Sequence, residues 1–257
     1  MKFTAKLITA FVLTALIPVA TLGYLSYSSA KAALKKQSLE DLTLIADARE
    51  GQLYSFFELI KGRAMDFSSD GFIRDTAEAL RALDAQRPRF AELQKDLNAH
   101  LKRNKMPLDR SIRLISVADV NGKIISSTDE PEVGASESDD DYFVHGKKGV
   151  YMSDLRVPPR IAEGVSPYIA VSAPLRVRET GSLLGVIINF YDALKLNKIL
   201  SGKFQLEKGA LTSLPGKRKT LNIYLVNKGK LLITPSIYGG EVMKQRVESP
   251  PVLECVA

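Results

Sequence analysis

The pattern of hydrophobic and polar positions begins with an uninterrupted apolar run. Residues 7–30 are 24 residues without a charged side chain, between Lys6 and Lys31. At about 1.5 Å per residue, such a helix is long enough to cross a bilayer core of about 30 Å. A signal peptide has an apolar stretch of only about 7–15 residues. The run therefore predicts an uncleaved membrane anchor; a cleaved signal, with Ala30-Lys31-Ala32 as its cleavage site, is the alternative.

The flanks of this run set the expected topology. Lysines stand on both sides of it, so the positive-inside rule does not decide its orientation. The very short segment before it favours a cytoplasmic tail at residues 1–6 and a transmembrane helix at 7–30. We therefore expect a single span in the inner (cell) membrane, with the bulk of the chain in the periplasm or outside the cell.

The next stretch, residues 31–110, has helical spacing. Apolar side chains recur at three- to four-residue steps as far as Phe67, which predicts one long helix continuing out of the span. Ser68-Ser69-Asp70-Gly71 then breaks the helix and supplies N-cap residues for a short second one. Pro88 is suited to the first turn of a third helix.

At Ser111 the period changes to that of strands. Asn121-Gly122 lies between two β-rich runs and predicts a hairpin. Further strands are expected at 149–153, 168–175 and 183–191, followed by a short helix at 193–200. Residues 111–200 therefore predict an α+β module with an antiparallel sheet.

The hairpin theme returns near the end of the chain. Gly229-Lys230-Leu231-Leu232 repeats Gly122-Lys123-Ile124-Ile125 at a separation of 107 residues, and Asn227-Lys228-Gly229 forms the expected turn. Such spacing suggests two related modules. Because two strands cannot close a core, residues 201–257 predict an incomplete second module, either a remnant or part of something longer.

Composition excludes several classes of function. The one cysteine rules out an internal disulfide, and His100 and His145 stand far apart without a second ligand at metal spacing. The net charge of +7 is spread along the chain, and the basic triplet 217–219 has no interleaved aromatic residues, so a solvated turn is favoured over a nucleic-acid partner. No nucleophile elbow or phosphate loop is present. We expect no enzyme, no metal and no cofactor.

In order and spacing, four stretches resemble the bacterial double Cache sensor domain. They are the anchor running into a long helix; Phe67–Asp75; Asp141-Tyr142-Phe143 with the segments 150–154, 169–174 and 185–188; and the segments 224–227 and 232–236. The resemblance implies a long helix, a membrane-distal PAS-like module at 111–200, and a partial membrane-proximal module at 201–257. It also implies a small-molecule ligand, a lipid bilayer around the anchor, and a homodimer through the long helix.

For function, the resemblance implies the input part of a transmembrane signalling protein, in the first place a sensor histidine kinase. The alternatives are a chemoreceptor sensor fragment and a membrane-tethered binding protein with no output of its own. The chain has no tryptophan, so it lacks the Arg-x-Trp-Tyr core of the amino-acid-binding subgroup. Amino-acid specificity is therefore not implied.

The family pocket lies after the acidic loop and along the strands beyond that loop. The corresponding positions here are Tyr142, Tyr151, Asp154 and Tyr168, with Arg156 and Arg160 as charge partners. Tyrosines offer an apolar wall with a polar tip, an Asp suits an amine, and an Arg suits a carboxylate. The alternative is that the tyrosines are core residues and the charges are solvated. The acidic run 137–141 lacks the spacing of a calcium loop and is expected to be a solvated loop.

Overall fold

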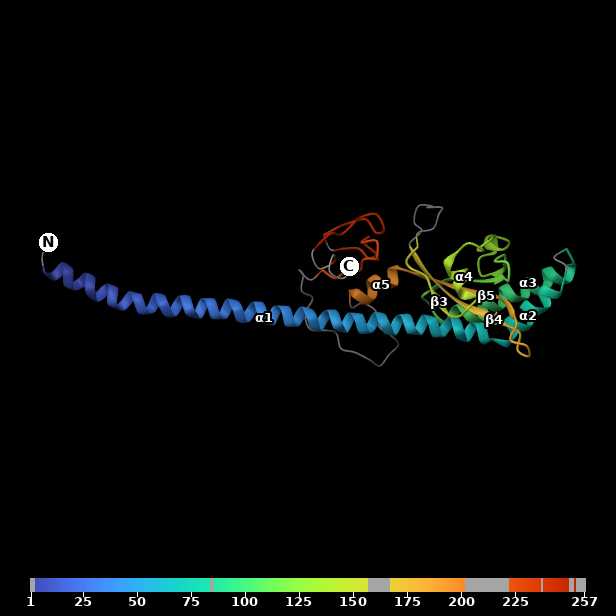
Figure 1. Ribbon diagram of the computed structural model, residues 1–257, viewed down its shortest axis with the longest axis horizontal. Coiled ribbons are helices and arrows are strands. Elements are labelled where there is room, and N and C mark those ends of the chain that lie inside the picture. The colour runs from blue at the N-terminus through green and yellow to red at the C-terminus, as the bar shows by residue number, and fades with distance from the viewer. Residues whose placement is uncertain are drawn as a thin grey trace. The chain divides into compact units, whose positions relative to one another are not determined.

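The computed structural model describes residues 3–83, 86–156, 167–201, 222–236, 238–249 and 252 (Figure 1). Its helices are α1 (Phe3–Ser69), α2 (Gly71–Ala82), α3 (Pro88–His100), α4 (Asp141–Gly146) and α5 (Leu194–Leu200). The strands are β1 (Ile112–Asp119), β2 (Ile124–Ser127), β3 (Tyr151–Met152), β4 (Tyr168–Arg176) and β5 (Leu183–Asp192). Short helical turns lie at Leu101–Lys105, Met106–Leu108 and Glu130–Glu132.

The chain divides into two compact units, Met1–Gln52 and Leu53–Ala257, and α1 supplies the boundary. In the first unit, all described side chains from Phe3 to Glu40 are exposed. An 18-residue window of this helix has a mean hydropathy of 2.0, and none of it is buried. The hydroxyls of Thr14 and Thr21 donate to backbone carbonyls one turn earlier, at 2.7 and 2.8 Å, so they need no water. By length and composition this helix can cross a membrane, and the predicted long helix is confirmed.

The second unit is built on a five-stranded antiparallel sheet in the order β2-β1-β5-β4-β3. The predicted hairpin forms its edge. Asp119 Oδ1 accepts the backbone N–H groups of Asn121 and Lys123, each at 2.9 Å. Gly122 has φ of +91°, which a residue without a side chain adopts at low cost. The Asp119 hydrogen bonds and the positive φ of Gly122 therefore fix where the chain reverses between β1 and β2.

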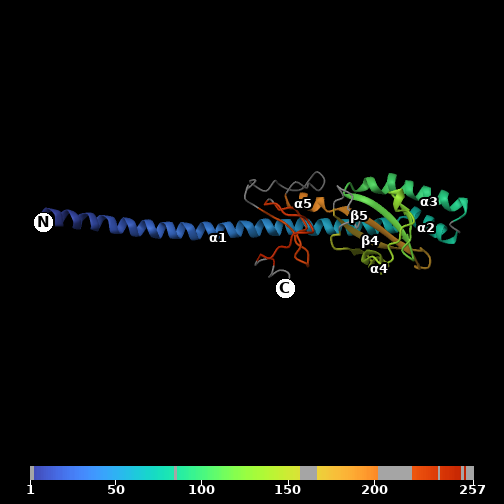
Figure 2. The same cartoon turned by 90° about the horizontal axis from the view of Figure 1, so that it is seen from above.

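Helices cover both faces of this sheet. The end of α1, with α2 and α3, packs on one face through a large core that includes Phe56, Ile60, Leu80, Leu97, Ile115, Ile187 and Tyr191. On the opposite face, α4 covers a smaller core of Ala118, Tyr142, Phe143, Ala170, Val186, Ile188 and Phe190 (Figure 2). The central strand β5 contributes alternate side chains to both cores, so it is buried on both faces.

Polar side chains fix α2 and α3 against the rest of the unit. The Asp70 carboxylate caps α2 by accepting the Ile73 N–H at 3.0 Å, and it pairs with the Lys105 ammonium at 2.5 Å. On α3, Asn98 Oδ1 accepts the Ser126 hydroxyl at 2.6 Å and the Ser127 N–H at 3.0 Å. The Asn98 bonds hold α3 to β2, and the Asp70 bonds tie the start of α2 to the turn that follows α3.

The segment at 222–249 differs from the predicted second hairpin. Single antiparallel bridges join Val226 to Leu232 and Leu231 to Arg246, and no regular strand forms among the described residues of this segment. Ile223, Leu225, Ile233 and Met243 nevertheless pack against the larger core. The expected turn is present, since the Lys230 N–H donates to the Asn227 carbonyl at 2.9 Å. Residues 202–221 lie outside the described part, and the predicted domain boundaries stay predictions.

Candidate ligand site on the α4 face of the sheet

The short helix α4 places the first candidate residues because it lies unusually close to the sheet. A Cβ atom on Gly146 would stand only 2.5 Å from Ser172 Oγ of β4, so glycine is what permits this approach. The same Ser172 hydroxyl donates to the Tyr142 carbonyl at 2.6 Å. Helix and strand are thus joined beneath the side chains of the site.

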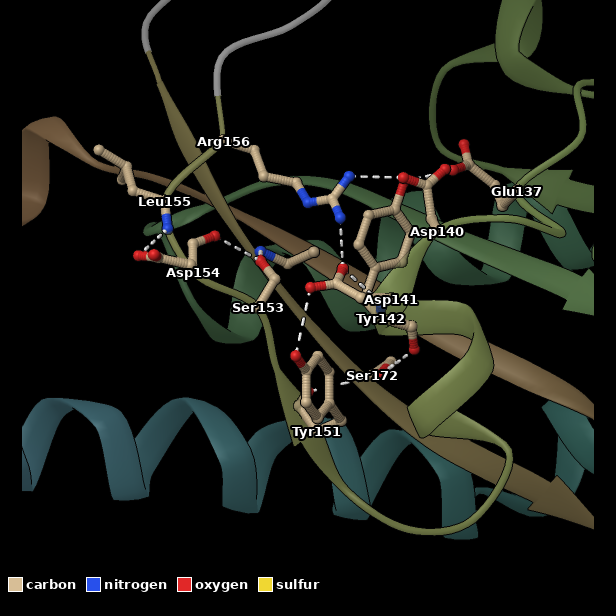
Figure 3. A network of polar contacts seen from close by, with 11 residues as sticks. Glu137, Asp140, Asp141, Tyr142, Tyr151, Ser153, Asp154, Leu155, Arg156 and Ser172 are labelled. Carbon is tan, nitrogen blue, oxygen red and sulfur yellow. Dashed lines mark hydrogen bonds and ion pairs between the residues drawn. The ribbon is translucent and has the colours of Figure 1, made fainter. Parts of the chain in front are cut away.

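The centre of the site is an arginine held by two adjacent carboxylates. Arg156 Nη1 contacts Asp140 Oδ1 and Nη2 contacts Asp141 Oδ1, both at 2.5 Å (Figure 3). Its guanidinium carbon lies 5.1 Å from the centre of the Tyr142 ring, within the range of a cation–π interaction. Backbone hydrogen bonds between Arg156 and Tyr168, at 2.8 and 2.9 Å, form an isolated antiparallel bridge that fixes the backbone from which this side chain extends.

Burial and charge decide the protonation of this arginine. Partial burial disfavours the cation, but the carboxylates of Asp141 and Asp140 outweigh that effect and raise the pKa of Arg156 above its ordinary value. The guanidinium therefore stays charged. Two acidic groups surround one cation, and the ring of Tyr142 closes the third side.

A hydrogen-bonded pair of an acid and a tyrosine, Glu137 and Tyr142, lies beside Arg156. The Tyr142 hydroxyl donates to Glu137 Oε2, and the Tyr142 side chain is 2% exposed. Burial raises the pKa of Glu137 to about 7, although the hydrogen bond from Tyr142 acts in the opposite direction. Burial, and then the same hydrogen bond, raise the pKa of Tyr142, so the phenol stays neutral. The Glu137 carboxyl group therefore changes its charge near neutral pH.

Aromatic rings line the site below these polar groups. Tyr142 and Tyr168 each meet the Phe190 ring edge to face, with centroids 5.7 and 5.4 Å apart. Tyr151 stacks on His145 with centroids 4.7 Å apart, and its hydroxyl donates to Asp141 Oδ2 at 3.2 Å. The arrangement offers carboxylate oxygens above an aromatic floor, which suits a cationic group.

The structure brings four of the six predicted site residues together. They are Tyr142, Tyr151, Tyr168 and Arg156, and they share the contacts above. Their role as ligand contacts stays a prediction.

The other two predicted residues are not part of this cluster. Asp154 is exposed, its carboxylate accepts the N–H of Leu155 at 2.7 Å, and it points away from the carboxylate pair (Figure 3). Arg160 lies outside the described residues. Their predicted ligand contacts are untested.

The expectation of a solvated loop at 137–141 is wrong for three of its residues. Glu137, Asp140 and Asp141 are partly buried and bonded to Tyr142 or Arg156. The sequence carried little signal for this pairing, because several arginines follow the acidic run within the same module. Within the described residues, no group of three or more metal-ligating side chains is placed to hold an ion.

Comparisons with known proteins bear on this fold. No protein-family model matches the sequence, and no curated protein does. Among solved structures, the sensor domain of the histidine kinase DctB from V. cholerae superposes with a TM-score of 0.59 at 12% identity, over 86% of this chain and 75% of that one.

Two further solved structures are more distant. The sensor domain of DcuS from E. coli has a TM-score of 0.39 at 16% identity, over 60% of this chain and 97% of that one. The ligand-binding domain of the amino acid chemoreceptor PctB from Pseudomonas aeruginosa, in complex with L-Arg, has a TM-score of 0.43 at 12% identity, over 76% and 68%. The similarity to DctB shows that the chain has the fold of a Cache-type sensor domain.

Proposed function

We propose that this chain is the membrane-anchored, extracytoplasmic sensor region of a transmembrane signalling protein, with no catalytic role of its own. The observation that carries the proposal is a sensor-domain fold that comes, in the same chain, after an apolar helix long enough to span a membrane. A sensor histidine kinase is the first expectation for the complete protein. A chemoreceptor and a tethered binding protein are the alternatives, and the type of output domain separates them.

The chemistry of the α4 face supports a ligand with a positively charged amine. Three carboxyl groups, of Glu137, Asp140 and Asp141, stand near a single guanidinium, that of Arg156. A cation between carboxylates and a tyrosine ring is already stabilised here, because Arg156 fills that place. We propose that the amine of the ligand binds the Asp140–Asp141 pair, either beside this guanidinium or in exchange for it.

A thermal-shift screen of amines against the full chain in lipid nanodiscs tests the ligand site. A bound amine stabilises the folded state by RT ln(1 + [L]/Kd), about 2.7 kcal/mol at a hundredfold excess over Kd. Asp141→Asn should remove most of that shift, since a hydrogen bond to a charged group typically contributes about 1.5–3 kcal/mol and the Asp141 carboxylate is only partly buried. Asp139→Asn is the matched control, because Asp139 is an exposed neighbour whose carboxylate accepts the Ser138 hydroxyl.

Two outcomes would contradict this site. If the shift survives Asp141→Asn, the ligand binds elsewhere. If Asp154→Ala removes the shift while Asp141→Asn keeps it, the pocket lies at the position predicted from the sequence and not at the carboxylate pair.

Reporter fusions test the proposed topology. Alkaline phosphatase fused after Lys36 should be active, because the short segment before the apolar run favours export of the rest of the chain. A reporter that works only in the cytoplasm should stay silent at the same site. The reverse result would refute an extracytoplasmic sensor region.

The proposed homodimer rests on α1. Beyond the apolar run, Leu39 and Leu42 lie three residues apart and are exposed by 56% and 44%. Apolar side chains at helical spacing suit a second copy of the helix. With Cys255 replaced by serine, single cysteines at positions 39 to 44 should give disulfide-linked dimers in membranes with helical periodicity. Absence of cross-links at all these positions would refute dimerisation through this part of α1.

A further inference from the structure

A cavity lies on the other face of the sheet, away from α4. Its volume is about 450 Å³, within the range of roughly 300–1,000 Å³ usual for small-molecule pockets. It opens between α2, α3 and the β1–β2 hairpin. Its lining includes Leu80, Arg81, Phe90, Asp119, Lys123 and Leu184. None of the α4-face residues contributes to it.

The inner wall of this cavity is apolar. Leu80, Ile124 and Leu184 are each at most 3% exposed and form its floor. Phe90 adds an aromatic ring from α3. A ligand that fills this space therefore needs an apolar body, because a fully polar molecule would lose its hydration against these side chains without gaining partners.

The rim of the cavity carries positive charge. Arg81 is exposed and uses Nη1 to donate to the Leu183 carbonyl at 3.0 Å, which leaves further guanidinium N–H groups for a ligand. The exposed ammonium of Lys123 makes no ion pair with any residue in the described part of the chain. The one carboxylate of the rim, that of Asp119, already accepts two backbone N–H groups through Oδ1. The charge balance of the rim favours an anion.

We infer that this cavity is a second binding site, for an organic anion with an apolar body and a carboxylate group. The apolar part lies against Leu80, Phe90 and Leu184, and the carboxylate faces Arg81 and Lys123. The site lies where α2 and α3 meet the sheet, a junction that Gln94 also bridges by donating to the Ile125 carbonyl at 2.8 Å. An occupant would therefore strengthen contact between the helical pair and the β1–β2 hairpin.

Binding of 2-naphthoate to the full chain in nanodiscs tests this inference, followed by ligand fluorescence and corrected with empty nanodiscs. We expect saturable binding, and at least tenfold weaker binding of the neutral 2-naphthalenemethanol. Lys123→Gln and Arg81→Gln should each weaken naphthoate binding about tenfold, because each removes a charged donor. Both side chains are exposed, so the variants should fold.

Controls separate this site from the one on the α4 face. Lys102→Gln removes an exposed cation that does not line the cavity and should leave binding unchanged. Asp141→Asn should also leave it unchanged, so failure of the amine site and failure of this one are distinguishable. Equal binding of the neutral alcohol, unchanged binding in both rim variants, or no saturable binding beyond empty nanodiscs would each overturn the inference.

Discussion

Replacing Gly146 by alanine measures how closely α4 lies against the sheet. The added Cβ would stand 2.5 Å from Ser172 Oγ, 2.9 Å from Ser172 Cβ and 3.0 Å from Val186 Cγ1. Ser172 cannot rotate away without cost, since its hydroxyl donates to the Tyr142 carbonyl at 2.6 Å. Overpacking of a well-filled core typically costs about 1–3 kcal/mol. We expect a loss of about 2 kcal/mol, which lowers the Tm of a unit of this size by about 4–8 °C.

The measurement needs a probe of the sheet, because α1 dominates the helical signal. The chain has no tryptophan, so near-ultraviolet circular dichroism of its tyrosines can follow melting of the full chain in nanodiscs. Gly149→Ala is the matched control, because a Cβ there meets nothing within 4 Å. We expect that variant to melt at or slightly above the temperature of the unchanged protein. If Gly146→Ala melts like the Gly149 variant, the close approach of α4 to β4 is refuted.

Two other predictions concern contacts described above. Asn98→Ala should cost about 1–3 kcal/mol, because it leaves the buried Ser126 hydroxyl and the Ser127 N–H without their acceptor, and hydrogen exchange at Ser127 should accelerate. Unchanged exchange there would contradict the role of Asn98. For Glu137, the folded chain keeps its proton to about pH 7 whereas the unfolded chain releases it near pH 4.5, so stability falls as pH rises through that window. Glu137→Gln should abolish this fall, worth about 1 kcal/mol after allowance for solvent screening, and an unchanged pH profile would contradict the raised pKa.

The fold was predictable where local chemistry and hydrophobic period agree. Asp70 caps α2, Pro88 opens α3, and Gly122 takes the positive φ of the hairpin turn, all as the sequence indicates. The long apolar runs of β4 and β5 were also recognisable, because both strands are buried over most of their length. Each of these signals lies within a few residues of the structure that it specifies.

The repeated hairpin motif shows the limit of such local signals. Asn227-Lys228-Gly229 makes its turn, yet Val226 and Leu232 share only a single bridge. A turn sequence fixes a reversal of the chain, but the length of the ladder depends on neighbouring strands that no local pattern reveals.

The site was predictable in its aromatic residues and less so in its charges. Tyr142 stands directly before Phe143 in a short segment between strands, a pattern that indicates burial. The partners of Arg156 were not predictable, because a charged residue has no periodicity and Asp140 lies 16 positions earlier in the chain. The surroundings of Asp154 were not predictable for the same reason. In sequence it resembles a buried partner, but its carboxylate accepts the N–H of the next residue, Leu155.

The central position of β5 has a consequence for how this fold can diversify. Val186 and Ile188 belong to the core beneath α4, whereas Ile187 between them belongs to the core beneath α1. Neighbouring residues of β5 therefore pack in two separate cores, and few substitutions in this strand would be neutral for both. New surface chemistry should arise instead in peripheral segments, such as the acidic run before α4 and the loop after β2, which can accept mutations while β5 stays apolar.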